Sequence, residues 1–151
     1  MKHFTMIELI AVMALTALLA SMVLSMNNIN NQVTVTQIEL GTMIEKAKMA
    51  NTITRLDSVI TYDGKIFTID YYEHNAAGIP ELHSKSHELG DVTLQIFQNG
   101  QAMSTFRFRD FEVFPGGGEI RLEISTPKDK GVIIRVNTFT GKVSYYESAK
   151  L

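Results

Sequence analysis

The sequence contains no cysteine, which excludes disulfide bonds, thiolate metal sites and cysteine nucleophiles. A large net charge is also missing. Fourteen basic and 16 acidic residues give a net charge of −2 and a pI near 6.1, so no strong overall field draws the chain to nucleic acid or anionic lipid. Apolar residues make up 45% of the 151 positions, enough for the core of one domain with an appended helix.

Charge is scarcest between Phe4 and Met26, where Glu8 is the only ionisable residue and neither glycine nor proline occurs. A helix of this length extends roughly 35 Å, enough to cross a hydrocarbon core of about 30 Å. We therefore predict a short leader (1–3) followed by a transmembrane helix (4–26). Lys2 precedes the span and no second apolar stretch follows it. This pattern favours a single pass through a membrane, with a cytoplasmic N-terminus and an extracytoplasmic head.

Glu8 is unusual in such a span, because a carboxylate deep in a bilayer costs about 2.5–3.5 kcal/mol by insertion scales. Two interpretations follow from the residues. Either Glu8 lies near the end of the span and reaches the headgroups, or its charge has a specific function within the span.

The segment that contains Glu8 reads Phe-Thr-Met-Ile-Glu-Leu-Ile-Ala-Val-Met-Ala-Leu-Thr-Ala-Leu-Leu-Ala from Phe4 onward. It closely resembles the class III signal of type IV prepilins and pseudopilins. That family has a short basic leader, an aromatic first mature residue, glutamate at the fifth mature position and an apolar helix. Two positions depart from the pattern: His3 stands where glycine is usual, and Ser25 stands where proline is frequent. The alternatives are a plain membrane anchor, or a secretory signal peptide with Val23-Leu24-Ser25 near its cleavage site.

The resemblance implies a processing pathway and a set of partners. A prepilin peptidase would cleave between His3 and Phe4 and methylate the new amine of Phe4. Glu8 would then face the N-terminal ammonium of a neighbouring pilin subunit and set the axial register. A paired carboxylate is tolerated in an apolar core far better than an unpaired one. An inner-membrane assembly platform is a further implied partner.

The rest of the chain divides into a joining helix (27–56) and a β-rich head (57–151). Asparagines at 27–32 mark the exit of the helix from the membrane or a frayed stretch. Beyond them, residues recur at steps of three and four, as on one face of an amphipathic helix from about 35 to 55. These residues are Val33, Gln37, Ile38, Leu40, Ile44, Ala47, Met49 and Ala50. Gly41 weakens the helix by about 1 kcal/mol.

After Asp57 the apolar pattern changes to period two, which predicts an antiparallel sheet laid against this helix in an α+β fold. We expect a hairpin with a type I′ turn at Asp63-Gly64 and an exposed polar loop at 74–90. The further strands expected are 92–98, 103–108, 119–125, 132–137 and 142–147.

The stretches 111–124 and 131–143 also resemble the head of H-type pseudopilins and related minor pilins. That family shares a Phe-x-Pro-x-Gly turn and a closing strand pair that ends in Asn-x-x-Thr-Gly-Lys/Arg-Val. The resemblance implies a minor subunit more than a major pilin, in a secretion pseudopilus or in a type IV pilus-like filament.

The sequence shows no arrangement typical of an enzyme, a metal site or a cofactor site. His83 and His87 would share one face of a helix, but the surrounding residues 74–90 are predicted to form a loop and no third ligand is arranged with them. The glycines at 116–118 have strand-like residues on both sides, whereas a phosphate-binding loop leads from a strand into a helix. Carboxylates are scattered, so no calcium loop is indicated.

DNA binding is a further prediction, and it rests on four basic residues. Arg107 and Arg109 alternate with aromatic residues, which places the two arginines on one strand face and the two rings on the other. Lys128 and Lys130 flank a turn. The simpler interpretation is a solvated face opposite a core face, because non-specific DNA binding needs a denser basic patch. Two functions are thus predicted: a structural pilin-like subunit or, alternatively, an exported or membrane-tethered β domain that binds a ligand, DNA included.

Overall fold

The computed structural model describes the backbone of residues 6–127 and 131–147. Side chains are described at Thr16, Ala17 and Gln32, and from Val33 to Tyr146 except at 128–130. The chain separates into two compact units, 1–32 and 33–151. The first unit is helical from Met6 onward and the second is the head. The predicted span 4–26 lies, apart from positions 16 and 17, outside the residues with described side chains. Among the residues that are described, no helix is long and apolar enough to cross a membrane.

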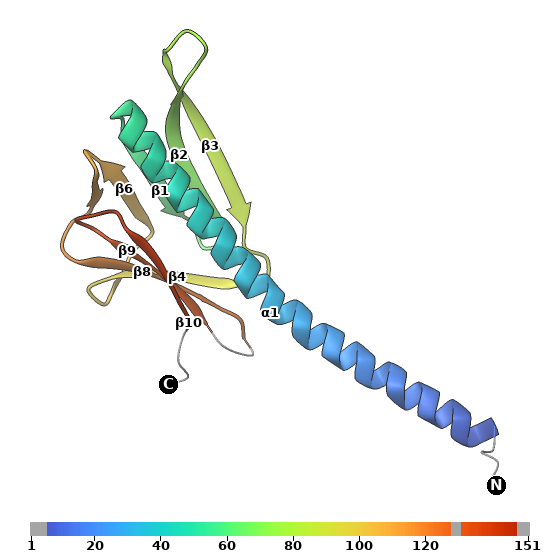
Figure 1. Ribbon diagram of the computed structural model, residues 1–151. Coiled ribbons are helices and arrows are strands. Elements are labelled where there is room, and N and C mark those ends of the chain that lie inside the picture. The colour runs from blue at the N-terminus through green and yellow to red at the C-terminus, as the bar shows by residue number, and fades with distance from the viewer. Residues whose placement is uncertain (1–5, 128–130, 148–151) are drawn as a thin grey trace. The chain divides into compact units, whose positions relative to one another are not determined.

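Helix α1 runs from Met6 to Thr54 without interruption (Figure 1). The asparagine-rich stretch 27–32 is helical, so it neither frays nor ends the helix. The predicted helix from about 35 to 55 is therefore the C-terminal part of a longer one. Arg55, which has a positive φ of 62°, ends the helix, and its backbone N–H donates to the carbonyl of Asn51 at 2.9 Å.

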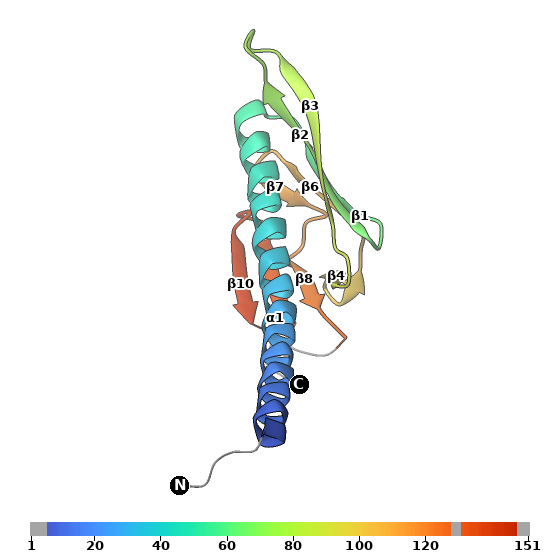
Figure 2. The same cartoon turned by 90° about the vertical axis from the view of Figure 1, so that its right-hand side faces the viewer.

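The head has an α+β architecture in which the part of α1 from Val33 onward packs on two antiparallel sheets of five strands each. The first sheet has the order β3-β2-β1-β6-β7 and the second has the order β10-β9-β8-β4-β5. The strands are β1 (Ser58–Tyr62), β2 (Ile66–His74), β3 (Pro80–Glu88), β4 (Thr93–Gln98), β5 (Gln101–Ala102), β6 (Thr105–Arg109), β7 (Glu112–Phe114), β8 (Glu119–Ser125), β9 (Val132–Asn137) and β10 (Val143–Glu147). Within the head, β2 and β3 lie on one side of α1 and β10 on the other (Figure 2).

One hydrophobic core joins the helix to both sheets. Every second residue of β8 is buried (Ile120, Leu122, Ile124), and β6 buries Phe106 and Phe108. This alternation is the period-two pattern that the sequence displays, because successive strand residues point to opposite faces. The helix contributes a matching stripe to the same core: Val33, Leu40, Met43, Ile44, Ala47 and Ala50.

Contact with β10 explains why a glycine, Gly41, stands inside this helix. A Cβ built at Gly41 would lie 2.6 Å from Cε1 and 2.8 Å from Cζ of Tyr145, and closer still to its hydroxyl. Only a residue without a side chain lets the Tyr145 ring of β10 lie directly against the helix backbone. Burial raises the pKa of the Tyr145 phenol, and the nearby Glu45 carboxylate adds to this effect.

Three expectations about the head were wrong. Residues 74–90 do not form a loop throughout, because 80–88 form β3, an edge strand paired with β2 along its whole length. The turn after β1 is not type I′, because that type needs two residues with positive φ and only Gly64 has one here (99°). The Asp63 side chain also shapes this turn, since its Oδ1 accepts hydrogen bonds from the backbone N–H groups of Lys65 and Ile66. Ile38 and Met49 belong to the exposed side of α1, not to its packed face.

Candidate functional site

The side of α1 that faces away from the core carries an exposed apolar face. Val35, Ile38, Met49 and Ile53 are 51%, 60%, 63% and 62% exposed. At about 100° per residue these four positions fall within about 60° of one another around the helix. We call them the apolar stripe of α1. They form two pairs, Val35 with Ile38 and Met49 with Ile53, about 16 Å apart along the helix with exposed Thr42 between them. Large aliphatic side chains gathered on one exposed face can form the anchors of an interaction surface.

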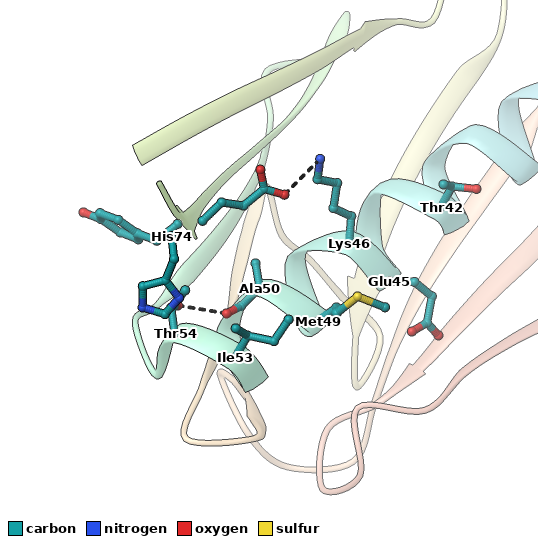
Figure 3. A pocket seen from close by; sticks show the side chains of 10 residues that line it. Thr42, Glu45, Lys46, Met49, Ala50, Ile53, Thr54 and His74 are labelled. Atoms are coloured by element: carbon teal, nitrogen blue, oxygen red, sulfur yellow. Dashed lines mark hydrogen bonds and ion pairs between the residues drawn. The ribbon is translucent and has the colours of Figure 1, made fainter. Parts of the chain in front are cut away.

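A groove lies beside the C-terminal half of the stripe, between α1 and the end of β2 (Figure 3). It encloses about 590 Å³. Met49, Ala50 and Ile53 supply much of its apolar lining. The other residues that line it are Thr42, Glu45, Lys46, Thr54, Tyr72, Glu73 and His74. A groove of this composition suits an apolar side chain or a helix face better than a charged ligand.

The charged residues at the groove already have partners. Lys46 Nζ lies 3.2 Å from Glu73 Oε1 and 4.7 Å above the Tyr71 ring. A hydrogen bond with the Tyr71 side chain, with a smaller contribution from Glu73, raises the pKa of Lys46 against the opposing effect of its partial burial. Lys48 Nζ approaches Glu45 Oε2 at 3.9 Å. Each of these charged side chains therefore lies beside a side chain of opposite charge.

Of the four predicted DNA contacts, the structure describes Arg107 and Arg109, and both already have an acidic partner. Arg107 and Arg109 share one face of β6, with both phenylalanine rings on the buried face, as the alternation predicted. Both guanidinium groups approach the same carboxylate, that of Asp57. Arg109 donates to it at 2.6 to 3.1 Å, and Arg107 lies 3.6 Å away. The Arg109 hydrogen bonds lower the pKa of Asp57. Lys128 and Lys130 lie outside the described residues.

The histidines of the 74–90 segment do not converge. His83 stacks on the Tyr71 ring, with centroids 5.8 Å apart, and His87 Nδ1 lies 2.7 Å from Glu39 Oε2 of α1. On a strand, positions four apart share a face but stand about 13 Å apart, too far for one metal ion. Across the described part of the chain, no three histidine, aspartate or glutamate side chains group as metal ligands.

The residues tied to processing and assembly stay predictions. His3 and Phe4 lie outside the described residues, and so does the side chain of Glu8, although its backbone belongs to α1. The apolar stripe, in contrast, was not predicted as a separate exposed face of the helix. Val35 and Ile53 fit a second apolar face about 155° from the first, and testing the helix for two separate faces would have found it.

Comparisons of this chain with protein-family models, with curated proteins and with solved structures found no match in any of the three.

Proposed function

We propose that this chain is a structural subunit of a type IV pilin-like filament, a minor pilin or a pseudopilin of a secretion pseudopilus. The observation that carries the proposal is Glu8, a single carboxylate at the fifth position after the His3–Phe4 bond within 23 otherwise uncharged residues. In a plain membrane anchor this carboxylate would only add to the free-energy cost of insertion. In an assembly it would pair with the N-terminal ammonium of Phe4 on a neighbouring subunit, which offsets that cost.

The exposed face of α1 supports the same proposal. A helix that only held the head together would place polar residues opposite its packed side. This helix instead leaves its apolar stripe in water and a groove beside Met49 and Ile53. Because about 40–50% of each side chain is already buried, covering the rest with the helix of a neighbouring subunit would release about 1–2 kcal/mol for each residue.

In this proposal the chain begins as a single-pass protein of the inner membrane with its head outside the cytoplasm. Prepilin peptidase processes it before Phe4, and the assembly platform then moves it into the filament with other pilin subunits. Its own part is structural: Glu8 fixes register, and the apolar stripe supplies contact area. No step requires catalysis by this chain.

Substitution of Glu8 tests the proposal directly in cells that produce the partner subunits. We expect Glu8→Ala to insert into the membrane at the wild-type level and to be lost from sheared filaments. Ser21→Ala is the matched control, because it removes a polar group from the same apolar segment without touching the carboxylate. If Glu8→Ala enters filaments as Ser21→Ala does, the assembly role of Glu8 is wrong.

A second pair of variants tests the apolar stripe. Met49→Glu places a charge within the stripe, whereas Thr52→Glu places the same charge one turn away at an exposed position off the stripe. We expect only Met49→Glu to reduce the amount of chain in filaments. Equal recovery of the two variants would exclude the stripe as a contact surface.

A further inference from the structure

The face of the second sheet that is turned away from the hydrophobic core carries a small pocket, which encloses about 370 Å³. Its lining comes from β4, the turn after β4, and β8: Phe97, Asn99, Gly100, Glu119 and Arg121. Glu119 and Arg121 alternate with the buried residues of β8, so their side chains point away from the core. The pocket shares no lining residue with the groove beside α1.

The wall formed by the turn after β4 is held in place by the fold. Asn99 and Gly100 connect β4 to β5 as a two-residue turn, and both have a positive φ (52° and 80°), the conformation that Asn-Gly favours. The side chains of the turn also hold the loop before β8. Gln98 Nε2 donates to the carbonyl of Pro115 at 2.7 Å, and Asn99 Nδ2 donates to the carbonyl of Gly117 at 3.1 Å. A wall that is already ordered lowers the entropy that a ligand must offset on binding.

The two charged side chains of the pocket are each balanced by a residue outside it. Arg121 Nη2 lies 2.7 Å from Glu123 Oε1, and Glu119 Oε1 lies 3.5 Å from Arg135 Nε. The side chains of Arg121 and Glu119 are nevertheless 45% and 46% exposed. A guanidinium group has five N–H donors and a carboxylate accepts about four hydrogen bonds, so both groups keep capacity for a ligand. The pocket therefore offers donors and acceptors side by side without a net charge.

Phe97 adds an apolar surface next to these polar groups. It lies directly opposite Arg121 on the neighbouring strand, and the guanidinium carbon is 5.9 Å from the centroid of the ring. The face of an aromatic ring is electron-rich, so it attracts C–H groups whose hydrogens carry a partial positive charge. A ligand in the pocket thus meets a ring on one side and hydrogen-bonding groups on the other.

This combination selects against most ligand classes. An anion would be repelled by Glu119 and a cation by Arg121. A purely apolar ligand would remove water from both charged groups without replacing their hydrogen bonds. A sugar ring has an apolar C–H face and hydroxyl groups that both donate and accept hydrogen bonds, and it carries no charge. Its chemistry matches each part of the lining.

We propose that this pocket binds a residue of a neutral saccharide. The C–H face of the sugar packs on Phe97, while Arg121 donates to its oxygen atoms and Glu119 accepts from its hydroxyl groups. This site goes beyond the filament function, because none of its residues belongs to the apolar stripe, the groove or the N-terminal segment. Saccharide binding and filament entry are therefore measured separately.

A tryptophan reporter tests the proposal, since the full chain has no tryptophan of its own. Phe97→Trp places one at the pocket and keeps an aromatic surface there. The full chain is titrated with cellotriose, mannotriose and triacetylchitotriose in a detergent without a sugar headgroup. We expect at least one of these sugars to change the tryptophan emission with a Kd of about 1 mM and with little dependence on salt. Saturation-transfer NMR should show that the same sugar contacts the wild-type chain.

Variants in the Phe97→Trp background make the test specific. Arg121→Leu should weaken binding at least about tenfold. Arg107→Leu is the matched control, because it removes an exposed strand arginine beside a carboxylate on the other sheet, and it should leave the Kd unchanged. Glu119→Gln separates neutral from anionic ligands, since it makes the pocket more positive and would tighten binding of glucuronate but not of a neutral sugar.

Three results would overturn the proposal. The first is an unchanged emission with all three sugars up to about 50 mM, far above the expected Kd. The second is equal binding in Arg121→Leu and Arg107→Leu. The third is binding of glucuronate that is tighter than binding of the sugars and that tightens further in Glu119→Gln, because the pocket would then be an anion site. None of these results bears on filament entry, which is read from the Glu8 experiment.

Discussion

The contact between Gly41 and Tyr145 gives the sharpest prediction about the head. Alanine at position 41 would raise the intrinsic stability of the helix by about 1 kcal/mol relative to glycine. Its Cβ, however, would occupy the space of the Tyr145 ring, with ring carbons 2.6 and 2.8 Å away. Tyr145 sits on an edge strand and is half exposed, so the ring would swing away from the helix instead of displacing the helix backbone.

The expected magnitude follows from the area that the ring would lose. A half-exposed tyrosine buries roughly 100 Å² of its surface, worth about 2.5 kcal/mol at about 25 cal/mol per Å². Gly41→Ala should therefore lower the free energy of unfolding by about 1.5 kcal/mol, the difference between this loss and the gain in helix stability. Tyr145→Ala alone should lower it by about 2.5 kcal/mol.

A double-mutant cycle separates the two contributions. In the Tyr145→Ala background the obstructing ring is absent, so Gly41→Ala should stabilise the head by about 1 kcal/mol. The assay is urea unfolding of the full chain in detergent, followed by the far-ultraviolet circular dichroism of its secondary structure. If Gly41→Ala raises stability equally in both backgrounds, the ring does not depend on the glycine and the reasoning is refuted.

The remaining predictions concern the end of α1 and the dependence of stability on pH. Asn51→Ala should destabilise the head by about 2 kcal/mol because it removes the donor to Leu56 and the acceptor for Phe111. Asn51→Asp keeps the acceptor but buries a carboxylate against the Leu56 carbonyl at the end of the helix, so it should cost at least as much, and a smaller loss would contradict the role of the donor. Arg109 lowers the pKa of Asp57, so this ion pair stabilises the fold fully above the unfolded pKa of 3.8 and loses its effect as the pH falls through the folded pKa. The difference in stability between wild type and Asp57→Asn should therefore vanish in acid. A difference that stays constant with pH would be inconsistent with the ion pair. Burial raises the pKa of Tyr145, so the neutral phenol contributes its full stability below pH 10, and this contribution declines as the pH rises through the folded pKa. Tyr145→Phe should lessen the decline in stability at alkaline pH. An unchanged alkaline profile in that variant would assign the decline to other groups.

Strands with one buried face were predictable, whereas strands without one were not. The bounds of β8 and β9 agree with the predicted 119–125 and 132–137, because Ile120, Leu122 and Ile124 alternate with polar residues. β3 has no buried residue, and its sequence Pro-Glu-Leu-His-Ser-Lys-Ser-His-Glu carries no alternation. It is a strand because β2 offers it a full register of backbone partners, and local sequence does not encode that tertiary contact.

The candidate site was predictable to a similar extent. The sequence located the amphipathic helix and the packed residues Leu40, Ile44 and Ala47, but it assigned Ile38 and Met49 to the same face. A helix with two apolar faces gives a weak periodic signal, since the second face cancels the contrast that identifies the first. At the end of α1, the guanidinium carbon of Arg55 lies 3.9 Å from the centroid of the Phe111 ring. This contact joins positions 56 residues apart and depends on a positive φ at both residues, which neither residue type favours.

The central claim is that this chain is processed and assembled as a pilin-like subunit, and its mature N-terminus tests that claim most directly. Mass spectrometry of the N-terminal peptide, from chain recovered from cells that contain prepilin peptidase, reads both the cleavage site and the modification. We predict a peptide that begins at Phe4 and carries one methyl group on its amine. A mature chain that begins near Met26 would indicate ordinary secretion and would contradict the account.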